Sequence, residues 1–145
     1  MNIFNKNIII KEIGLVDLNT LKDFVFELGD TPYFTYFDKR DIENSLKNHK
    51  LTLLLKENEK SCAYAHIDYD GEYNWFGLAV LKSCRGKGYG SYLLKYAVEF
   101  ADKNNMALRL MVYSKNDIAV KMYLRNGFKR LNEKEKGKIY MMRNK

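Results

Sequence analysis

A glycine-rich loop between a strand pattern and an amphipathic helix constrains the fold of this chain most strongly. The stretch from 78 to 101 opens with an apolar run and ends with apolar residues at helical spacing. Three glycines between them let successive backbone N–H groups approach a ligand without a Cβ in the way. The helix N-terminus that follows adds about half a positive charge. We therefore expect a phosphate-binding loop formed by Arg85, Gly86, Lys87, Gly88, Tyr89, Gly90 and Ser91.

Two widely used phosphate-binding motifs do not match this loop. A Walker loop requires GxxxxGK followed by Ser or Thr, and the chain contains no such string. A dinucleotide fingerprint that starts at Gly86 needs a glycine at its sixth place, where Ser91 stands. A simple connecting turn would account for one glycine, but it does not explain three of them beside Arg85 and Lys87. A different phosphate-binding fold is indicated.

The remaining patterns predict a single mixed α/β domain that spans 1–145. Strands are expected at 7–13, 51–57, 61–69, 72–81 and 107–113, with a hairpin turn at Asp70-Gly71. Helices are expected from Asp17 as the cap to a stop at Gly29, and over 39–48, 91–104 and 117–126, with Gly127 as a left-handed cap. A hairpin over 128–131 and 139–143 closes the chain. The predicted architecture is a mixed, mostly antiparallel sheet flanked by helices.

The loop resembles the pyrophosphate loop of the GNAT family of N-acetyltransferases. That family's loop reads Arg or Gln, two residues, Gly, one residue, then Gly or Ala, and Arg85, Gly88 and Gly90 match it in register. A second family motif follows at the right separation in the segment NDIAVKMYLRNGF. Its intervals are kept by Asn116, Ala119, Tyr123, Gly127 and Phe128. The resemblance covers the chain from Leu51 to the C-terminus, and the first fifty residues only in outline.

The resemblance implies acetyl-coenzyme A as the cofactor and a sheet that splays open beside the glycine loop. In the family, the main chain of the strand before the loop pairs with the pantetheine arm, and here that strand carries Leu78, Ala79 and Val80. The implied reaction is direct acetyl transfer to a primary amine of a small molecule, an amino sugar being one candidate, or of a protein. The implied protein is a monomer or a homodimer.

Two residues of the second motif are candidates for binding and catalysis. The Asn116 amide could hydrogen-bond the pantetheine arm, cap the helix that begins at Asp117, or do both. Tyr123 is a phenol with a reference pKa of about 10, so it is neutral at pH 7 and able to protonate a departing thiolate. Its alternative role is packing in the core.

Only a free amine attacks a thioester, and the resemblance implies that the group that accepts the amine's proton lies on the strand SCAYAHIDY or on its neighbour. Strand alternation places Tyr64, His66 and Asp68 on one face of this strand. The family often uses a Glu here, or an ordered water. The strand has no Glu, so His66 or Asp68 would have to serve, and His66 could equally be a structural histidine.

An aromatic segment lies where the family's variable acceptor-binding region is found. Such side chains can stack on a ring or on a sugar face. They could also anchor a loop to the core. The residues concerned are Tyr33, Phe34, Tyr36 and Phe37.

Two rival functions are considered. The resemblance allows a non-catalytic acyl-CoA-binding or sensor domain of the same fold, and the positive charge allows a small basic nucleic-acid-binding protein. The net charge is +7. The basic residues are spread along the chain and form no aromatic-interleaved strand, so a nucleic-acid partner is not expected. An intact Tyr123 argues against the sensor reading.

Other cofactors and locations are excluded by what the chain lacks. Two histidines and two separated cysteines, with no HExxH or CxxC spacing, predict no metal site. No apolar stretch is long enough to span a bilayer, so no membrane partner is expected. Cys62 and Cys84 are expected to be reduced thiols of a cytoplasmic protein.

Overall fold

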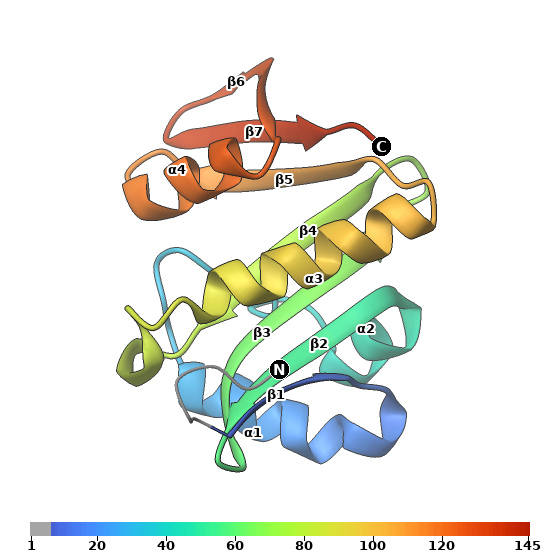
Figure 1. Cartoon of the computed structure of the whole chain (residues 1–145), viewed down its shortest axis with the longest axis vertical. Coiled ribbons are helices and arrows are strands. Elements are labelled where there is room, and N and C mark those ends of the chain that lie inside the picture. Colours follow the sequence, from blue (N-terminus) through green and yellow to red (C-terminus); the bar gives the residue numbers. More distant parts are fainter. Residues whose placement is uncertain (1–6) are drawn as a thin grey trace.

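The computed structural model describes residues 7–145, which form a seven-stranded sheet flanked by helices (Figure 1). The strands lie in the order β1-β2-β3-β4-β5-β7-β6. Their bounds are β1 Ile8–Glu12, β2 His49–Glu57, β3 Lys60–Tyr69, β4 Asn74–Val80, β5 Leu108–Tyr113, β6 Lys129–Glu135 and β7 Lys138–Arg143. The α-helices are α1 Leu18–Leu28, α2 Ile42–Asn48, α3 Tyr89–Lys103 and α4 Asp117–Arg125, and short 3₁₀ turns cover η1 Leu15–Asp17 and η2 Lys82–Cys84. The predicted mixed sheet is confirmed.

The sheet is split between β4 and β5, at the end nearest the glycine loop. Strands β1 to β4 form an antiparallel meander, whereas β4 and β5 run parallel and are paired only at Trp75 and Arg109. The two strands meet at one end and diverge toward Val80 (Figure 1). The predicted splay therefore opens beside the loop that connects β4 to α3.

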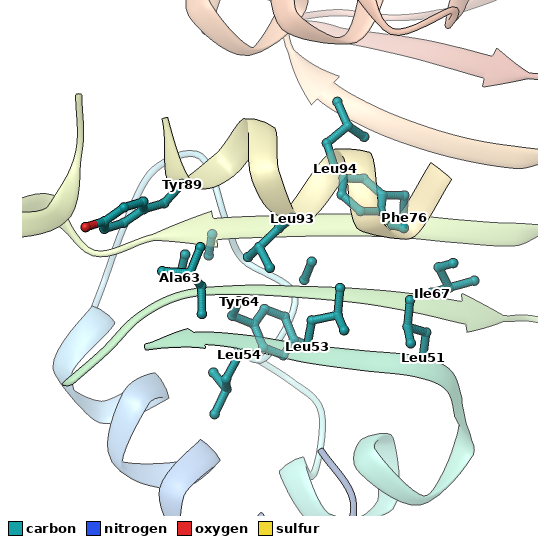
Figure 2. Close-up of a cluster of buried hydrophobic side chains, with 14 of the residues drawn as sticks. Leu51, Leu53, Leu54, Ala63, Tyr64, Ile67, Phe76, Tyr89, Leu93 and Leu94 are labelled. Carbon is teal, nitrogen blue, oxygen red and sulfur yellow. The ribbon is translucent and has the colours of Figure 1, made fainter. Parts of the chain in front are cut away.

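The two faces of the sheet are covered by different helices. Leu53 and Leu54 point to opposite faces, and Leu93 of α3 lies on the same side as Leu53 (Figure 2). On the other face α1 packs its Phe24 ring against Tyr64, with the ring centroids 6.0 Å apart. Side-chain alternation along β3 then sends His66 and Asp68 to the α1 face. The split between β4 and β5 connects the two faces.

Carboxylates decide several helix and strand ends. Asp41 accepts a hydrogen bond from the Asn44 amide at 2.9 Å and starts α2 at Ile42 rather than at 39. Asp17 does precede α1, but the prediction that its side chain caps the helix is wrong. Its carboxylate instead accepts from the Gly14 amide at 3.2 Å and from Lys11 at 2.9 Å.

The predicted strand 72–81 is shortened to Asn74–Val80 by the preceding turn. The Asp70 carboxylate accepts from the amides of Glu72 and Tyr73 at 2.8 and 2.7 Å, which holds both residues in the turn. At the other end of the chain β6 extends to Glu135, so the closing hairpin has longer strands than predicted. Gly127 adopts φ +90°, as a left-handed cap requires.

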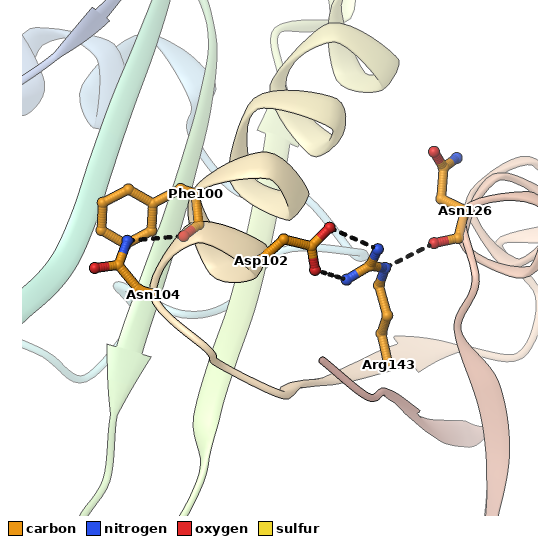
Figure 3. A network of polar contacts seen from close by, with 5 residues as sticks. All are labelled: Phe100, Asp102, Asn104, Asn126 and Arg143. Atoms are coloured by element: carbon orange, nitrogen blue, oxygen red, sulfur yellow. Dashed lines mark hydrogen bonds and ion pairs between the residues drawn. The ribbon is translucent and has the colours of Figure 1, made fainter.

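Arg143 clamps the C-terminal hairpin to the two helices that carry the motifs (Figure 3). Its guanidinium donates to both Asp102 carboxylate oxygens, at 2.7 and 3.1 Å, in the last turn of α3. Its Nε donates to the Asn126 carbonyl at 3.2 Å, directly after α4. The clamp fixes α4 relative to α3, and so the second motif relative to the glycine loop. No helix within residues 7–145 has the length and apolar character needed to span a membrane.

Candidate active site

A cavity of about 830 Å³ occupies the split between β4 and β5. It brings together both sequence motifs and the polar face of β3. Among the residues singled out in the sequence, its walls contain Tyr33, Phe34, Tyr36, His66, Asp68, Leu78, Ala79, Val80, Arg85, Gly86, Gly88, Tyr89, Gly90, Ser91, Asn116 and Tyr123. A smaller hollow of about 360 Å³ at the β6–β7 hairpin contains none of them.

The glycine loop places the N-terminus of α3 at one end of the cavity. Gly88 immediately precedes α3 and has φ +82°, a backbone conformation that side chains with a Cβ rarely adopt. Arg85 lines the cavity and donates from Nε to the Val80 carbonyl at 3.3 Å, which orients its guanidinium. Free helix amides, the helix dipole and one oriented guanidinium together suit phosphate oxygens.

Lys87 and Phe37 are the predicted site residues that the cavity walls do not include. The Lys87 ammonium lies 3.3 Å from the Glu57 carboxylate on β2. Tyr89 donates its hydroxyl to the same carboxylate, so this pair ties the loop to β2. Phe37 packs on Tyr64, with ring centroids 5.6 Å apart, and serves the core.

The strand edge beside the loop is open to the cavity. Leu78, Ala79 and Val80 pair with β3 on one side, and their other edge faces the split. Met111 and Tyr113 of β5 line the opposite wall. An extended ligand that carries amide groups can therefore add to this edge as a further strand would.

Tyr123 lies on the α3 face of the split. Its ring packs edge-on against Phe76 and Phe128, with centroid distances of 6.2 and 5.7 Å, and the residue is 7% exposed. Burial raises the pKa of Tyr123, so the phenol stays protonated at neutral pH. Asn116 lines the cavity nearby and accepts from the Ala119 amide at 3.4 Å, so it can cap α4 and still offer its NH₂ group.

His66 lies on the opposite face of the sheet, buried and neutral. Burial lowers its pKa well below the usual value. Its Nδ1 lies 2.7 Å from the buried Tyr64 hydroxyl, which has no other partner among residues 7–145. That hydroxyl is satisfied only as a donor to Nδ1, so the proton of the neutral ring is on Nε2. His66 therefore offers an N–H group and has no free acceptor atom.

Asp68 is the hydrogen-bond acceptor at the end of a series of side chains on this face. Its Oδ2 accepts from the Tyr36 hydroxyl at 2.7 Å. The Tyr36 oxygen in turn lies 2.8 Å from Nε2 of His49, and Nδ1 of His49 lies 2.9 Å from the Thr52 hydroxyl. Since a carboxylate only accepts, every donor in the series Thr52, His49, Tyr36 points toward Asp68.

The donors of this series stay in their neutral forms. Burial lowers the pKa of His49 to about 4, and burial followed by the nearby Asp68 carboxylate raises the pKa of Tyr36. The sequence reasoning missed His49 and Thr52. Their one signal is the alternation of β2, which brings Thr52 opposite His66 in the register.

Gly77 makes room for the His66 ring. The two residues pair across β3 and β4, and a Cβ at position 77 would lie 2.4 Å from Cε1 and 2.5 Å from Nε2 of His66. The ring cannot move aside easily, because its centroid is 4.1 Å from the Tyr36 ring and 4.6 Å from the His49 ring. The glycine therefore sets the position of the imidazole in the cavity.

Gly77→Ala is expected to destabilise the fold by about 1–3 kcal/mol, the usual cost of overpacking. Chemical denaturation measures this change, and Gly14→Ala is the control, because a Cβ there meets nothing within 4 Å. Adding His66→Ala to Gly77→Ala should recover part of the loss. If the Gly77→Ala protein were as stable as the Gly14→Ala protein, the absence of a Cβ at position 77 would not be required to accommodate the His66 ring.

Solved structures with the same fold include acetyltransferases. One from Streptococcus pneumoniae, of the GNAT family, aligns with a TM-score of 0.78 at 22% identity over 96% of this chain and 100% of its own. The PaiA N-acetyltransferase of Thermoplasma acidophilum, solved with coenzyme A, gives 0.74 at 17% identity over 96% and 99%. YncA of Salmonella typhimurium, solved with acetyl-CoA, gives 0.74 at 17% over 95% and 94%.

The sequence itself shows the family. Residues 18–128 match the model of the acetyltransferase (GNAT) family, which is well over half of the chain. No curated protein sequence matches the chain. The chain belongs to the GNAT acetyltransferase family, as the two motifs predicted.

Proposed function

We propose that this protein is an acetyl-CoA-dependent N-acetyltransferase that acetylates a primary amine of a small molecule or a protein. The observation that carries the proposal is the single cavity that joins the glycine loop to Tyr123 on one face of the split sheet and to Asp68 on the other. Family membership, together with the coenzyme A and acetyl-CoA bound in two similar solved structures, supports the cofactor.

The residues from the glycine loop to Asn116 fit acetyl-CoA along one part of the cavity. Arg85 and the N-terminal amides of α3 would hold the phosphates. The open edge of β4 from Leu78 to Val80 and the Asn116 amide would hold the pantetheine arm. Bound there, acetyl-CoA supplies an acetyl group activated as a thioester.

The two faces of the sheet divide the proton transfers. Asp68 accepts the proton of the amine, directly or through water, and the Nε2–H of His66 donates a hydrogen bond beside Gly77. Tyr123 donates toward the sulfur on the other face. A thiol has a reference pKa of about 8.5 and a phenol of about 10. Because burial raises the pKa of Tyr123 further, this phenol stabilises the developing thiolate chiefly by hydrogen bonding.

Acetyl-CoA is expected to raise the melting temperature. At a hundredfold excess over Kd, a ligand that binds only the folded protein adds about 2.7 kcal/mol of stability. For a chain of this size that corresponds to a shift of about 5–10 °C in thermal denaturation. Gly88→Val should weaken binding at least about tenfold, because the backbone it requires is strained for a branched residue.

Gly137→Val is the matched control for Gly88→Val. Gly137 has nearly the same backbone angle, φ +79° against +82°, but lies in the β6–β7 turn outside the cavity. Both variants should lose stability, and only Gly88→Val should lose the cofactor shift. No shift of the native protein with millimolar acetyl-CoA would refute the assignment. A shift without thiol release on any amine would favour a non-catalytic acyl-CoA-binding domain.

A further inference from the structure

The cavity contains a second arginine, far along the fold from the glycine loop. Among the described residues that line it, Arg85 and Arg40 carry a positive charge. Arg85 belongs to the phosphate loop. Arg40 lies before α2, in the segment that crosses the α1 face of the split, and so on the side where Asp68 and His66 are found.

Tyr36 holds Arg40 in a defined position. The guanidinium carbon lies 4.1 Å from the centroid of the Tyr36 ring, and Nη1 donates to the Tyr36 carbonyl at 2.9 Å. No carboxylate of residues 7–145 comes within ion-pair distance of Arg40. The positive charge and the remaining N–H groups of the planar fork are thus left for a ligand.

The two carboxylates on the same side of the cavity are already engaged. Asp68 accepts the Tyr36 hydroxyl at 2.7 Å. Asp70 accepts three N–H groups, two from the turn amides and one from the Trp75 indole at 2.8 Å. Arg40 is therefore the charged group of this face with the most unused hydrogen-bonding capacity.

Arg40 lies close to His66 and Asp68, beside which the amine of the acceptor would bind, because all three residues contact Tyr36. The Tyr36 ring centroid is 4.1 Å from the Arg40 guanidinium carbon and 4.1 Å from the His66 ring centroid. The guanidinium and the imidazole are consequently separated by at most twice that distance. Asp68 accepts the hydroxyl of the same Tyr36 at 2.7 Å and lines the same cavity as Arg40, so one small molecule can extend along Tyr36 from Arg40 to Asp68.

We propose that Arg40 binds an anionic group of the acetyl acceptor, so that the acceptor is an amine with a phosphate or carboxylate in the same molecule. This inference rests on the proposed function and specifies its substrate class. Arginine matches the geometry of both anions through paired N–H groups. Tyr33 and Trp75 line the same side of the cavity and offer ring faces to the rest of the acceptor.

Two matched pairs of acceptors test the proposal. Alanine is compared with alaninamide, and glucosamine 6-phosphate with glucosamine, by thiol release from acetyl-CoA. At least one anionic member should have a kcat/KM about tenfold or more above that of its uncharged partner. The pair that shows the preference identifies carboxylate or phosphate as the anion. Equal rates within both pairs would overturn the proposal.

Arg40→Gln should raise KM for the preferred anionic acceptor by about 10- to 100-fold, the range for a hydrogen-bonded charged contact. KM for its uncharged partner should stay near the native value. Arg40→Lys should fall between, since it keeps the charge and loses the planar fork. Lys39→Gln removes an adjacent exposed cation outside the cavity and should change neither. An anion preference that survives Arg40→Gln would refute the role of Arg40.

Binding separates this inference from the proposed function. Calorimetric titration of the four compounds into coenzyme A-loaded protein reports recognition without turnover. If the anionic compounds bind, Arg40→Gln abolishes that binding and no compound is acetylated, the result would support the anion site at Arg40 and refute the proposed acetyltransferase activity. Acetylation with no preference for the anionic compounds would support the acetyltransferase activity and refute the anion site at Arg40. Binding of none of the four compounds would overturn the inference.

Discussion

Tyr123→Phe is expected to lower turnover by about 10²- to 10⁴-fold, with acetyl-CoA affinity close to that of the native protein. The change removes one oxygen and leaves the ring that packs on Phe76 and Phe128. Burial alone raises the pKa of Tyr123, with no hydrogen bond to another of residues 7–145, so removal of the hydroxyl leaves no partner group unpaired. The loss should therefore appear in kcat and not in the stability of the fold.

Steady-state kinetics and the acetyl-CoA melting shift check this prediction together. Tyr92→Phe is the control, because Tyr92 is a half-buried tyrosine of α3 that does not line the cavity. Both variants should keep the melting shift, and only Tyr123→Phe should lose turnover. If the two turn over equally, Tyr123 is a packing residue, which its burial would also explain.

The second half of the fold could be predicted from the sequence because its signals are local. Three glycines, an apolar stripe and a helix start within a few residues define the loop and α3. The second motif fixes α4 in the same way, and Gly127 ends it with the expected left-handed backbone. Nothing in these signals depends on which strand lies beside which.

The acceptor side could not be predicted, because it forms only when distant segments meet. From the sequence, Tyr36 was a candidate either for stacking on a ligand or for anchoring a loop to the core, whereas in the structure its hydroxyl joins Asp68 of β3 to His49 of β2. His49 gave no signal, since it stands at a helix–strand junction with no motif around it. In the sequence Arg40 is one of many scattered cations, and only its contact with Tyr36 in the structure distinguishes it.

The turn of the glycine loop and the pairing of β3 with β4 explain two further differences between the sequence predictions and the structure. Lys87 follows Arg85 by two residues, but the turn directs Lys87 to Glu57 on β2 and leaves Arg85 in the cavity. Gly77 reads as an ordinary strand glycine, and only the pairing of β3 with β4 sets it against His66. Periodicity tells which face a residue occupies, whereas pairing tells which neighbour it meets.

Asp68→Asn is expected to reduce turnover at neutral pH by about 10²- to 10⁴-fold, because an amide cannot take a proton from the amine. The fold should persist, since the amide oxygen can still accept the Tyr36 hydroxyl. The deficit should shrink as the pH rises, because more acceptor is then already a free amine. Protonation of His66 or His49 should not shape the rate near neutrality, as burial lowers the pKa of both imidazoles.

The rate against pH for native, Asp68→Asn and His66→Gln proteins decides between the two candidates for the base. Asp38→Asn, at an exposed carboxylate outside the cavity, controls for the loss of one negative charge near this face. If Asp68 is the acceptor, its variant loses most activity and its deficit depends on pH, whereas His66→Gln keeps the native profile shape at a lower rate. The opposite pattern would assign the base to His66 and require that its Nε2 be unprotonated, with the Tyr64 hydroxyl accepting from Nδ1 and its own buried proton left without a partner.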